Sequence, residues 1–252
     1  MSRMDEEPGW AVTLEQWCTV VRPGEQVLRI RNGCKVLCLA HRESSACLCL
    51  APGWQGLLAL RPGLQVVCGN AWVFPLSQMN LVKLQFFIDQ GVVPEAQAAR
   101  NEPWAVLSEG RARGRAVSGL ESWYLTLALR GDAAYRSFAR QLRGGESYQL
   151  LGFLLEQGST SEKLQDLAGR YGVSVSHFRR LCRQALGGAA KPELRGWRTA
   201  QALLCMTEGA ASLTDVALEF GYASSSHFSK EIRELVGVAP SSLIDITRLS
   251  SE

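Results

Sequence analysis

Residues 164–188 read LQDLAGRYGVSVSHFRRLCRQALGG, and residues 213–237 repeat the pattern as LTDVALEFGYASSSHFSKEIRELVG. In each copy an aromatic residue and a Gly follow an apolar-periodic segment, at Tyr171-Gly172 and Phe220-Gly221. A His-Phe pair comes next, at His177-Phe178 and His227-Phe228. The offset between the copies is 49 residues before the turn and 50 after it, because the second turn holds one extra residue. The chain therefore builds one structural device twice.

Each copy predicts a helix, a tight turn and a second helix. The first helix of the first copy has one apolar face, formed by Leu164, Leu167, Ala168 and Tyr171. Gly172 and Gly221 follow where this helix must stop, since Gly adopts the left-handed conformation at the least cost. Ser174 and Ser224 then provide hydroxyls suited to capping the second helix. Ser212 is expected to cap the first helix of the second copy, and Ser224 or Ser225 is expected to cap its second helix.

The second helix of the first copy separates apolar from polar residues. The residues expected to face inward are Phe178, Leu181 and Cys182, and the outer face carries Ser176, Arg179, Arg180 and Arg183. An Arg-rich face just after a helix-turn-helix corner suits a DNA major groove. One such corner is common in all-α cores, whereas two copies with polar outer faces favour DNA binding.

The region from about Glu146 to Ser250 resembles the DNA-binding domain of the AraC/XylS family of transcriptional activators. The resemblance rests on Trp197-Arg198, Leu213-x-x-Val216-Ala217, Phe220-Gly221-Tyr222, His227-Phe228 and Gly237-Val238-Ala239-Pro240. It implies two helix-turn-helix units joined by one long helix. We expect that helix to begin at Pro192, a favoured first-turn residue, with Trp197 and Leu204 packing against both units. A closing helix is expected over 240–249.

One branch of the family is more similar still. Residues 148–155 (YQLLGFLL), 171–174 (YGVS), 177–188 (HFRRLCRQALGG) and 194–198 (LRGWR) resemble the InvF/MxiE-like activators of type III secretion genes. The resemblance implies a DNA-binding transcription activator of type III secretion and virulence genes that works with RNA polymerase at double-stranded promoter DNA. It also implies a secretion chaperone as a protein co-activator, in place of the small-molecule effector of other family members.

The resemblance also assigns roles on the two recognition helices. Base contacts are carried over to Ser176, Arg179 and Arg180, and in the second copy to Ser225, Ser226 and Lys230. Arg reads guanine through two hydrogen bonds, whereas short hydroxyls suit phosphate or water-bridged contacts. Arg183 and Arg233 lie one turn further along and are expected to hold phosphates. His177 and His227 each precede a core Phe, so a scaffold role is expected for both.

Length and charge limit the number of domains and the kinds of partner that the chain can have. A chain of 252 residues suits two modest domains, expected at 1–140 (regulatory or partner-binding) and 146–252 (DNA-binding). The net charge of +3 is too small to predict a nucleic-acid partner. Local charge is more informative, because one acidic residue, Glu193, stands among the basic residues at 170, 179, 180, 183, 191, 195 and 198. An Arg-rich stretch at 111–115 is interpreted as a solvated loop.

The N-terminal region predicts mostly β structure followed by helices, so the fold class is α+β with an all-α C-terminal domain. Strands are expected at 27–31, 36–39 and 47–50, and Pro-Gly turns at 23–24 and 62–63 introduce further strands. A cupin-like barrel is an analogy with the broad family. Helices are expected over 76–90, with Leu81, Leu84, Gln85, Phe87 and Ile88 on its apolar face, and over 119–129, with Trp123 and Leu127 inward. Their apolar faces could pack within the chain or against a second subunit, which leaves a homodimer open. Residues 140–145, RQLRGG, are expected to be the linker.

No signal peptide or membrane-spanning run is found, so a cytoplasmic protein with no membrane partner is expected. The eight Cys are expected to be reduced thiols. Five of them, Cys34, Cys38, Cys47, Cys49 and Cys68, stand in apolar runs and are expected in the core.

Two alternatives to the chaperone-assisted activator remain open. One is a regulator that senses a small ligand in its barrel. The other is an Ada-like DNA-repair alkyltransferase with zinc held by these Cys and His41. We expect no catalytic residue, no metal site and no cofactor.

Overall fold

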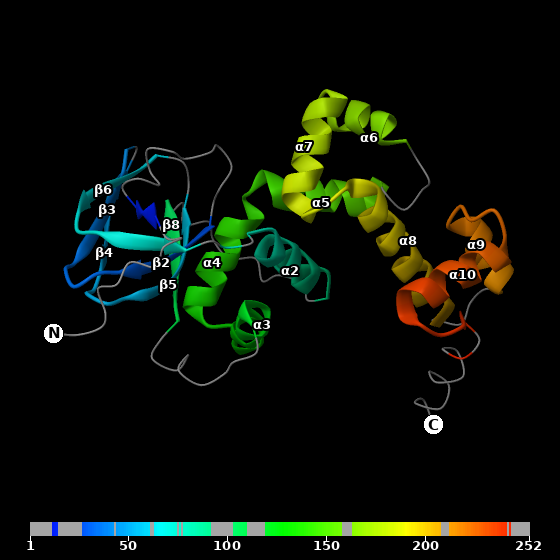
Figure 1. Cartoon of the computed structure of the whole chain (residues 1–252), viewed down its shortest axis with the longest axis horizontal. Coiled ribbons are helices and arrows are strands. Elements are labelled where there is room, and N and C mark those ends of the chain that lie inside the picture. The colour runs from blue at the N-terminus through cyan, green and yellow to red at the C-terminus, as the bar shows by residue number, and fades with distance from the viewer. Residues whose placement is uncertain are drawn as a thin grey trace. The chain divides into compact units, whose positions relative to one another are not determined.

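The computed structural model describes residues 12–14, 27–42, 44–60, 63–74, 76, 78–91, 103–109, 119–157, 163–207, 212–240 and 242. The chain divides into two compact units, Met1–Tyr148 and Gln149–Glu252, and Figure 1 shows strands in the first and helices in the second. Several expectations lie outside the described residues: the N-terminal segment, the Pro-Gly turn at 23–24, the loop at 111–115 and most of the closing helix at 240–249.

The first unit contains two antiparallel sheets. One has the order β1 (Val12–Thr13), β7 (Ala71–Phe74), β2 (Val27–Asn32), β5 (Gln55–Leu60) and β8 (Trp104–Ser108). The other has the order β4 (Ser44–Leu50), β3 (Leu37–His41) and β6 (Leu64–Cys68). Both sheets contribute leucines to a single core, among them Leu28 and Leu58 from the first and Leu37, Leu39 and Leu50 from the second. The mostly-β N-terminal region and the three predicted strands are confirmed.

The alternation of side chains along β3 explains where the cysteines lie. Leu37, Leu39 and His41 are buried, whereas Cys38 between them is half-buried and faces the other side of the sheet. On β4 and β6 the same outward face carries Cys47, Cys49 and Cys68, all exposed, and Cys34 is exposed in the loop before β3. The expectation that these five cysteines belong to the core is therefore wrong, because leucines at the alternate positions fill it. Contact with the thiols of Cys49 and Cys68 raises the pKa of Cys38 to about 12.

Three helices of the first unit pack on one another. They are α2 (Gln78–Gly91), α3 (Leu120–Arg130) and α4 (Ala133–Arg143), and α4 also packs on β8 and β5. Both predicted helices are confirmed, but each is rotated from the expected face. In α2 the buried residues are Leu81, Val82, Gln85 and Phe86, while Phe87 is exposed. In α3 Tyr124 is buried, and Trp123 and Leu127 are half-buried.

The expected linker at 140–145 is wrong for most of its length. Its first four residues belong to α4, which continues to Arg143 and buries Leu142 completely. Only Gly144 and Gly145 form a turn before α5 (Glu146–Gln157) begins. The polar composition of RQLRGG predicts exposure, but Leu142 belongs to the core and Arg143 binds a buried carboxylate.

That carboxylate is Asp89 on α2, whose side chain is 6% exposed. Arg143 donates two hydrogen bonds to it, from Nε (2.7 Å) and Nη2 (2.6 Å), and Tyr148 donates a third at 2.6 Å. Gln85 donates a fourth at 2.9 Å and accepts bonds from the hydroxyls of two buried tyrosines, Tyr124 and Tyr135. Burial alone would raise the pKa of Asp89, but the bonds from Arg143 and Tyr148 outweigh it and the pKa is lowered.

Replacing Asp89 with Asn is expected to destabilise the first unit by about 1.5–3 kcal/mol at neutral pH, the usual contribution of charged hydrogen bonds. Because the pKa is lowered on folding, this stability is present above the unfolded-state pKa of about 3.9 and is lost as the pH falls through the folded value. Urea unfolding should therefore show that the difference in unfolding free energy between wild type and variant is smaller at pH 3 than at pH 7. Glu146→Gln, which alters an exposed carboxylate, is the control and should show little difference at either pH. A difference for Asp89→Asn that does not change with pH would contradict this account.

The second unit is helical. It continues α5 and adds α6 (Leu164–Tyr171), α7 (Val175–Leu186), α8 (Ala190–Thr207), α9 (Leu213–Glu219) and α10 (Ser225–Val236). Helices α6 and α7 pack together, as do α9 and α10, and α8 contacts α7, α9 and α10 (Figure 1). The prediction of two helix-turn-helix units joined by one helix is confirmed. No helix among the described residues is long and apolar enough to cross a membrane.

Candidate nucleic-acid interface

The first helix-turn-helix corner is fixed by its backbone and by three aromatic rings. Helix α6 stops at Gly172, whose φ is 81°, and the Oγ of Ser174 accepts a hydrogen bond from the backbone N–H of His177 at 3.2 Å. Beneath the turn the rings of Phe153, Tyr171 and Phe178 meet at centroid distances of 5.0–6.2 Å. The predicted turn Gly and Ser cap are confirmed, and they set the direction in which α7 leaves the corner.

The second corner uses the same devices on a different core. Ser212 and Asp215 form a capping box at the start of α9. Gly221 has a φ of 72°, and Ser224 caps α10 by accepting from the backbone N–H of His227 at 3.2 Å. The buried residues below include Ala202 and Met206 of α8, Val216 and Ala217 of α9, and Phe228 and Ile232 of α10. Both Ser caps predicted for this unit are confirmed.

Helix α7 turns its predicted DNA-binding residues outward. Ser176, Arg179, Arg180 and Arg183 are all exposed, and Phe178, Leu181 and Cys182 are buried on the opposite side. Within the described part of the chain, none of the three arginines forms a side-chain hydrogen bond or ion pair. Their guanidinium donors are therefore available to a ligand with several acceptor oxygens or nitrogens.

Helix α10 presents a less basic face over a shallow cavity of about 420 Å³, lined by Leu213, Ser225, Ser226, Ser229, Lys230 and Arg233. Ser226, Lys230 and Arg233 are exposed, and Ser225 is half-buried. Ser229 was not predicted, although it stands five residues after its cap, as Arg179 does in α7. Counting from the two capping serines would have found it.

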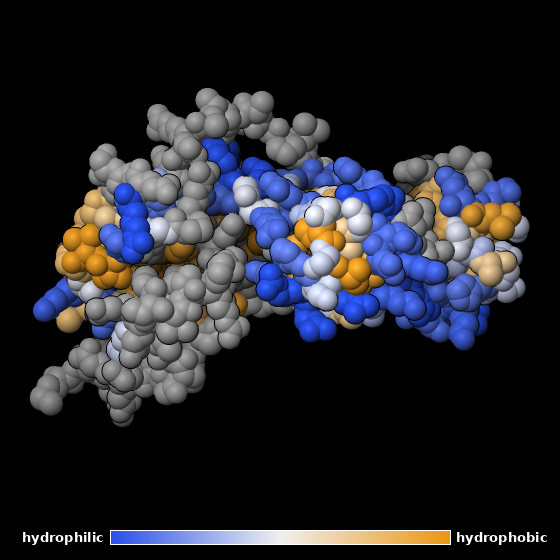
Figure 2. All heavy atoms as spheres, turned by 90° about the horizontal axis from the view of Figure 1, so that it is seen from above, coloured by the Kyte–Doolittle hydropathy of each residue, from blue (hydrophilic) through white to orange (hydrophobic). Residues whose placement is uncertain are grey.

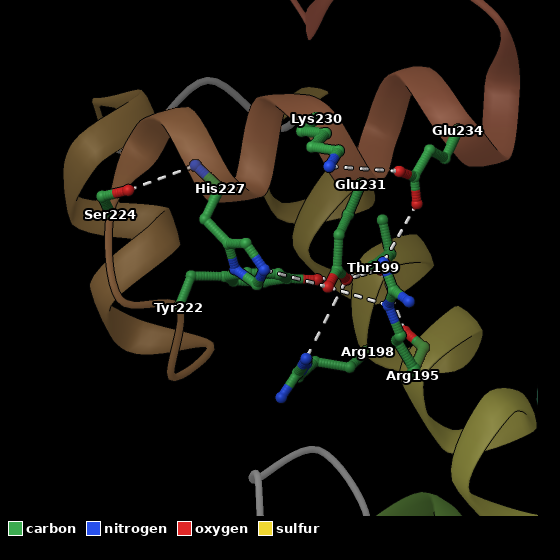
Figure 3. Close-up of polar contacts among 9 residues, drawn as sticks. All are labelled: Arg195, Arg198, Thr199, Tyr222, Ser224, His227, Lys230, Glu231 and Glu234. Atoms are coloured by element: carbon green, nitrogen blue, oxygen red, sulfur yellow. Dashed lines mark hydrogen bonds and ion pairs between the residues drawn. The ribbon is translucent and has the colours of Figure 1, made fainter.

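A buried carboxylate ties α10 to α8 (Figure 3). Glu231 is 5% exposed, and its Oε1 lies 2.8 Å from Nε of Arg195. Its Oε2 lies 3.9 Å from Nη2 of Arg198 and accepts a hydrogen bond from Thr199 at 3.2 Å. Arg195 also reaches Glu234 at 3.0 Å. No sequence pattern pointed to Glu231, because Arg195, Arg198 and Thr199 lie more than thirty residues away on another helix.

Tyr222 closes this network from the turn. Its hydroxyl lies 2.8 Å from the Thr199 hydroxyl, and the Arg198 guanidinium stacks 4.6 Å from the centre of its ring. His227 lies at the edge, with Nε2 3.7 Å from Glu231, while its backbone N–H is bound to the cap. Arg195 and Arg198 counted toward the basic cluster in the sequence, but their charges are directed at Glu231. The basic surface therefore rests mainly on α7.

Two expectations about α8 need correction. The helix begins at Ala190, so Pro192 lies within its first turn instead of opening it. Leu204 is 63% exposed and is not an anchor between the units. The residues that α8 buries are Ala190, Thr199, Ala202 and Met206, and Trp197 is half-buried. The helix face that meets α9 and α10 is therefore rotated away from Leu204.

Comparison with known proteins agrees with this architecture. The family model for a helix-turn-helix domain matches residues 167–245. Invasion protein InvF of Salmonella typhimurium is 42% identical over 187 residues, which cover 74% of this chain and 87% of InvF. Transcriptional regulator MxiE of Shigella flexneri is 35% identical over 134 residues, covering 52% of this chain and 64% of MxiE. The virulence regulon transcriptional activator VirF of Yersinia enterocolitica is 27% identical over 123 residues, covering 48% and 45%.

One assignment follows from the two helix-turn-helix units, the helix that joins them and the similarity over most of the length of InvF. The chain belongs to the AraC family of helix-turn-helix transcriptional regulators, in the branch that includes InvF and MxiE.

Proposed function

We propose that this protein is a sequence-specific transcription activator of virulence genes, including type III secretion genes, and that residues 146–252 bind its promoters. The observation that carries the proposal is the pair of capped recognition helices, each with an exposed polar face on a well-packed core. Two such helices on one domain suit neighbouring major-groove segments of a duplex. The names of the relatives, an invasion protein, a transcriptional regulator and a virulence regulon activator, support the class of target gene.

The two recognition helices divide the work unequally. In α7, Ser176, Arg179 and Arg180 read base edges and Arg183 holds a phosphate, because the arginines are exposed and have no partner among the described residues. In α10, Ser225, Ser226 and Lys230 make softer contacts, and Arg233 holds a phosphate. Lys230 lies 4.0 Å from Glu234, which lowers the positive potential there. The first helix-turn-helix unit therefore dominates sequence discrimination.

The family assignment supports the remaining roles in this proposal. The N-terminal domain, expected at 1–140 and extending through α4 to Arg143, is the regulatory domain, its partner is a type III secretion chaperone acting as co-activator, and the DNA-bound protein recruits RNA polymerase in the cytoplasm. A homodimer on the promoter is compatible with this arrangement. A regulator that senses a small ligand in its N-terminal domain is the rival proposal.

Selection from a library of genomic fragments, followed by DNase footprinting of the full-length protein, tests the proposal. The expected result is one recurring sequence with two protected segments about one helical turn apart. Adding a purified secretion chaperone from the same genome should increase promoter occupancy or transcription in vitro. Fragments recovered without a common sequence would reject sequence-specific binding. Activation by a small apolar ligand, with no response to chaperone, would support the rival regulator.

Replacing Arg180 with Ala is expected to weaken binding to the selected site by about 1–3 kcal/mol and to relax the preference at one base position. Arg183→Ala should weaken all sequences alike and reduce the salt slope by about one, since each neutralised phosphate contributes roughly −0.9. Titrations at several salt concentrations, on the selected site and on a scrambled site, separate the two effects. Arg130→Ala, an exposed Arg on α3, is the charge-matched control. Equal, sequence-independent losses from Arg180→Ala and Arg183→Ala would remove the base-reading role of Arg180.

A further inference from the structure

Four cysteines gather on the outward face of the β4-β3-β6 sheet. Cys38 on β3 stands opposite Cys49 on β4 and opposite Cys68 on β6, so three strands place a Cys at one register position. Cys47 lies two residues from Cys49 on the same face. The Sγ atoms of Cys38 and Cys49 are 3.2 Å apart and those of Cys47 and Cys49 are 3.9 Å apart. The Sγ atoms of Cys38, Cys47 and Cys49 all lie within 4.8 Å of one another.

Core packing does not account for this cluster. Cys47, Cys49 and Cys68 are exposed, while the alternate positions of the same strands carry the leucines of the core. Figure 2 shows hydrophobic residues gathered at the left end of the view. Val36, just before β3, and Val67, next to Cys68 in β6, are exposed. A well-behaved soluble surface carries few exposed free thiols. A ligand that engages the sulfurs would explain why they stand together.

The sulfur spacing suits a metal ion. Zinc–thiolate bonds are about 2.3 Å long, so tetrahedral coordination places neighbouring sulfurs about 3.8 Å apart. The observed separations of 3.2 and 3.9 Å lie on either side of that value. Soft thiolate ligands select Zn²⁺ and Cu⁺ over hard cations such as Mg²⁺. His41 is buried on the opposite face of β3 and is not part of the donor set.

We propose that the outward face of this sheet binds one thiophilic metal ion, Zn²⁺ or Cu⁺, through Cys38, Cys47 and Cys49. Cys68 stands opposite Cys38 on the neighbouring strand, outside the group of three sulfurs that lie within 4.8 Å of one another, and a rotation of its side chain would bring it in as the fourth ligand. Binding replaces the thiol protons, which pass to solvent. The bound ion joins β4, β3 and β6, so metal uptake stabilises this sheet of the regulatory domain.

Cobalt titration of the full-length protein, reduced and freed of metal, tests this site. The expected result is one Co²⁺ per chain with the near-ultraviolet thiolate-to-cobalt band, displaced by Zn²⁺. A parallel titration with Cu⁺ against a competing chelator shows which ion binds more tightly. Cys38→Ser and Cys49→Ser should each lower the affinity by about tenfold or more, since changes even one shell away cost 10–100-fold. Cys34→Ser changes an exposed thiol of the same unit that lies outside the cluster and should bind like wild type.

Three outcomes would overturn the proposal. The first is the absence of a thiolate-to-cobalt band in the reduced wild-type protein. The second is an equal loss of affinity for Cys34→Ser and Cys49→Ser. The third is a Cys38–Cys49 disulfide on mild oxidation with no cobalt uptake after reduction, which would make the face a redox site. Circular dichroism of each variant distinguishes loss of a ligand from loss of fold, and the wild-type titration decides the question even where a variant fails to fold.

Discussion

Replacing Glu231 with Ala is expected to destabilise the second helix-turn-helix unit by about 1.5–3 kcal/mol, the usual contribution of hydrogen bonds to a charged group. The variant would leave Arg195 and Arg198 without their shared carboxylate and would take an acceptor from Thr199. Helix α10 would lose its buried polar connection to α8 and keep the exposed Arg195–Glu234 pair, although no residue proposed to contact DNA is changed. Urea unfolding of the full-length protein should show an early transition for this unit, and footprinting should lose the segment protected by α10.

The same helix provides a matched control. Glu234→Ala removes a carboxylate three residues away that also pairs with Arg195, but its side chain is 52% exposed. Exposed pairs contribute about 0–1 kcal/mol, so this variant should unfold almost like wild type. Glu231→Gln keeps the shape and one acceptor oxygen and should fall between the two. If Glu231→Ala and Glu234→Ala have equally small effects, the buried network is not what holds α10.

The two repeats use different residues to hold their recognition helices against the core. Counting from the capping serines, the position of Glu231 in α10 is Leu181 in α7. Leu181 is buried among apolar residues, whereas Glu231 is buried among cations. An apolar contact tolerates small shifts of the helix, while a carboxylate bound by two arginines and a hydroxyl fixes its position and rotation. The second recognition helix is therefore the more strictly oriented of the two, which suits the proposed contact of its short serines with the duplex.

The helix-turn-helix units could be predicted from the sequence because their signals are local. A turn Gly, a capping Ser and an apolar face all lie within one stretch of 25 residues, and the duplication showed each signal twice. The outward direction of Arg179, Arg180 and Arg183 followed from the inward positions of Phe178, Leu181 and Cys182. Ser229 was missed although the offset of 50 residues beyond the turn places it opposite Arg179.

The failures share a different cause, since each depends on contacts far away in the sequence. Whether Cys47 or Leu48 faces the core depends on which sheet covers β4, and a period of two fits either choice. The stretch RQLRGG has the composition of a linker, but Arg143 pairs with Asp89, 54 residues earlier. Leu204 is apolar and helical, yet the rotation of α8 is fixed by Thr199, Ala202 and Met206. Local pattern identifies the elements, and only tertiary contacts decide which face of each element is buried.

Replacing Ala200 with Pro is expected to abolish binding to the two-groove site without altering any residue proposed to contact DNA. Ala200 is exposed in the interior of α8, so the substitution removes no side-chain packing. Pro there removes a backbone hydrogen bond and clashes with the preceding turn, at a cost of about 3 kcal/mol or more. The break separates two parts of α8. Arg195 and Thr199, which bind Glu231, lie before it, and Ala202 and Met206, which belong to the core of the second unit, lie after it.

Helix α8 has 18 residues, which at 1.5 Å each span about 27 Å, and successive major grooves lie about 34 Å apart. A rigid helix of this length, extended by the units at its ends, suits that spacing, whereas a kinked one does not. Footprinting should show both protected segments for wild type and for Ala200→Gly, which costs only about 1 kcal/mol and keeps the hydrogen bond. Ala200→Pro should protect at most the segment bound by α7. If the Pro variant retains wild-type helicity and still protects both grooves, then α8 does not set the distance between the recognition helices, and the DNA or a second protomer must supply it.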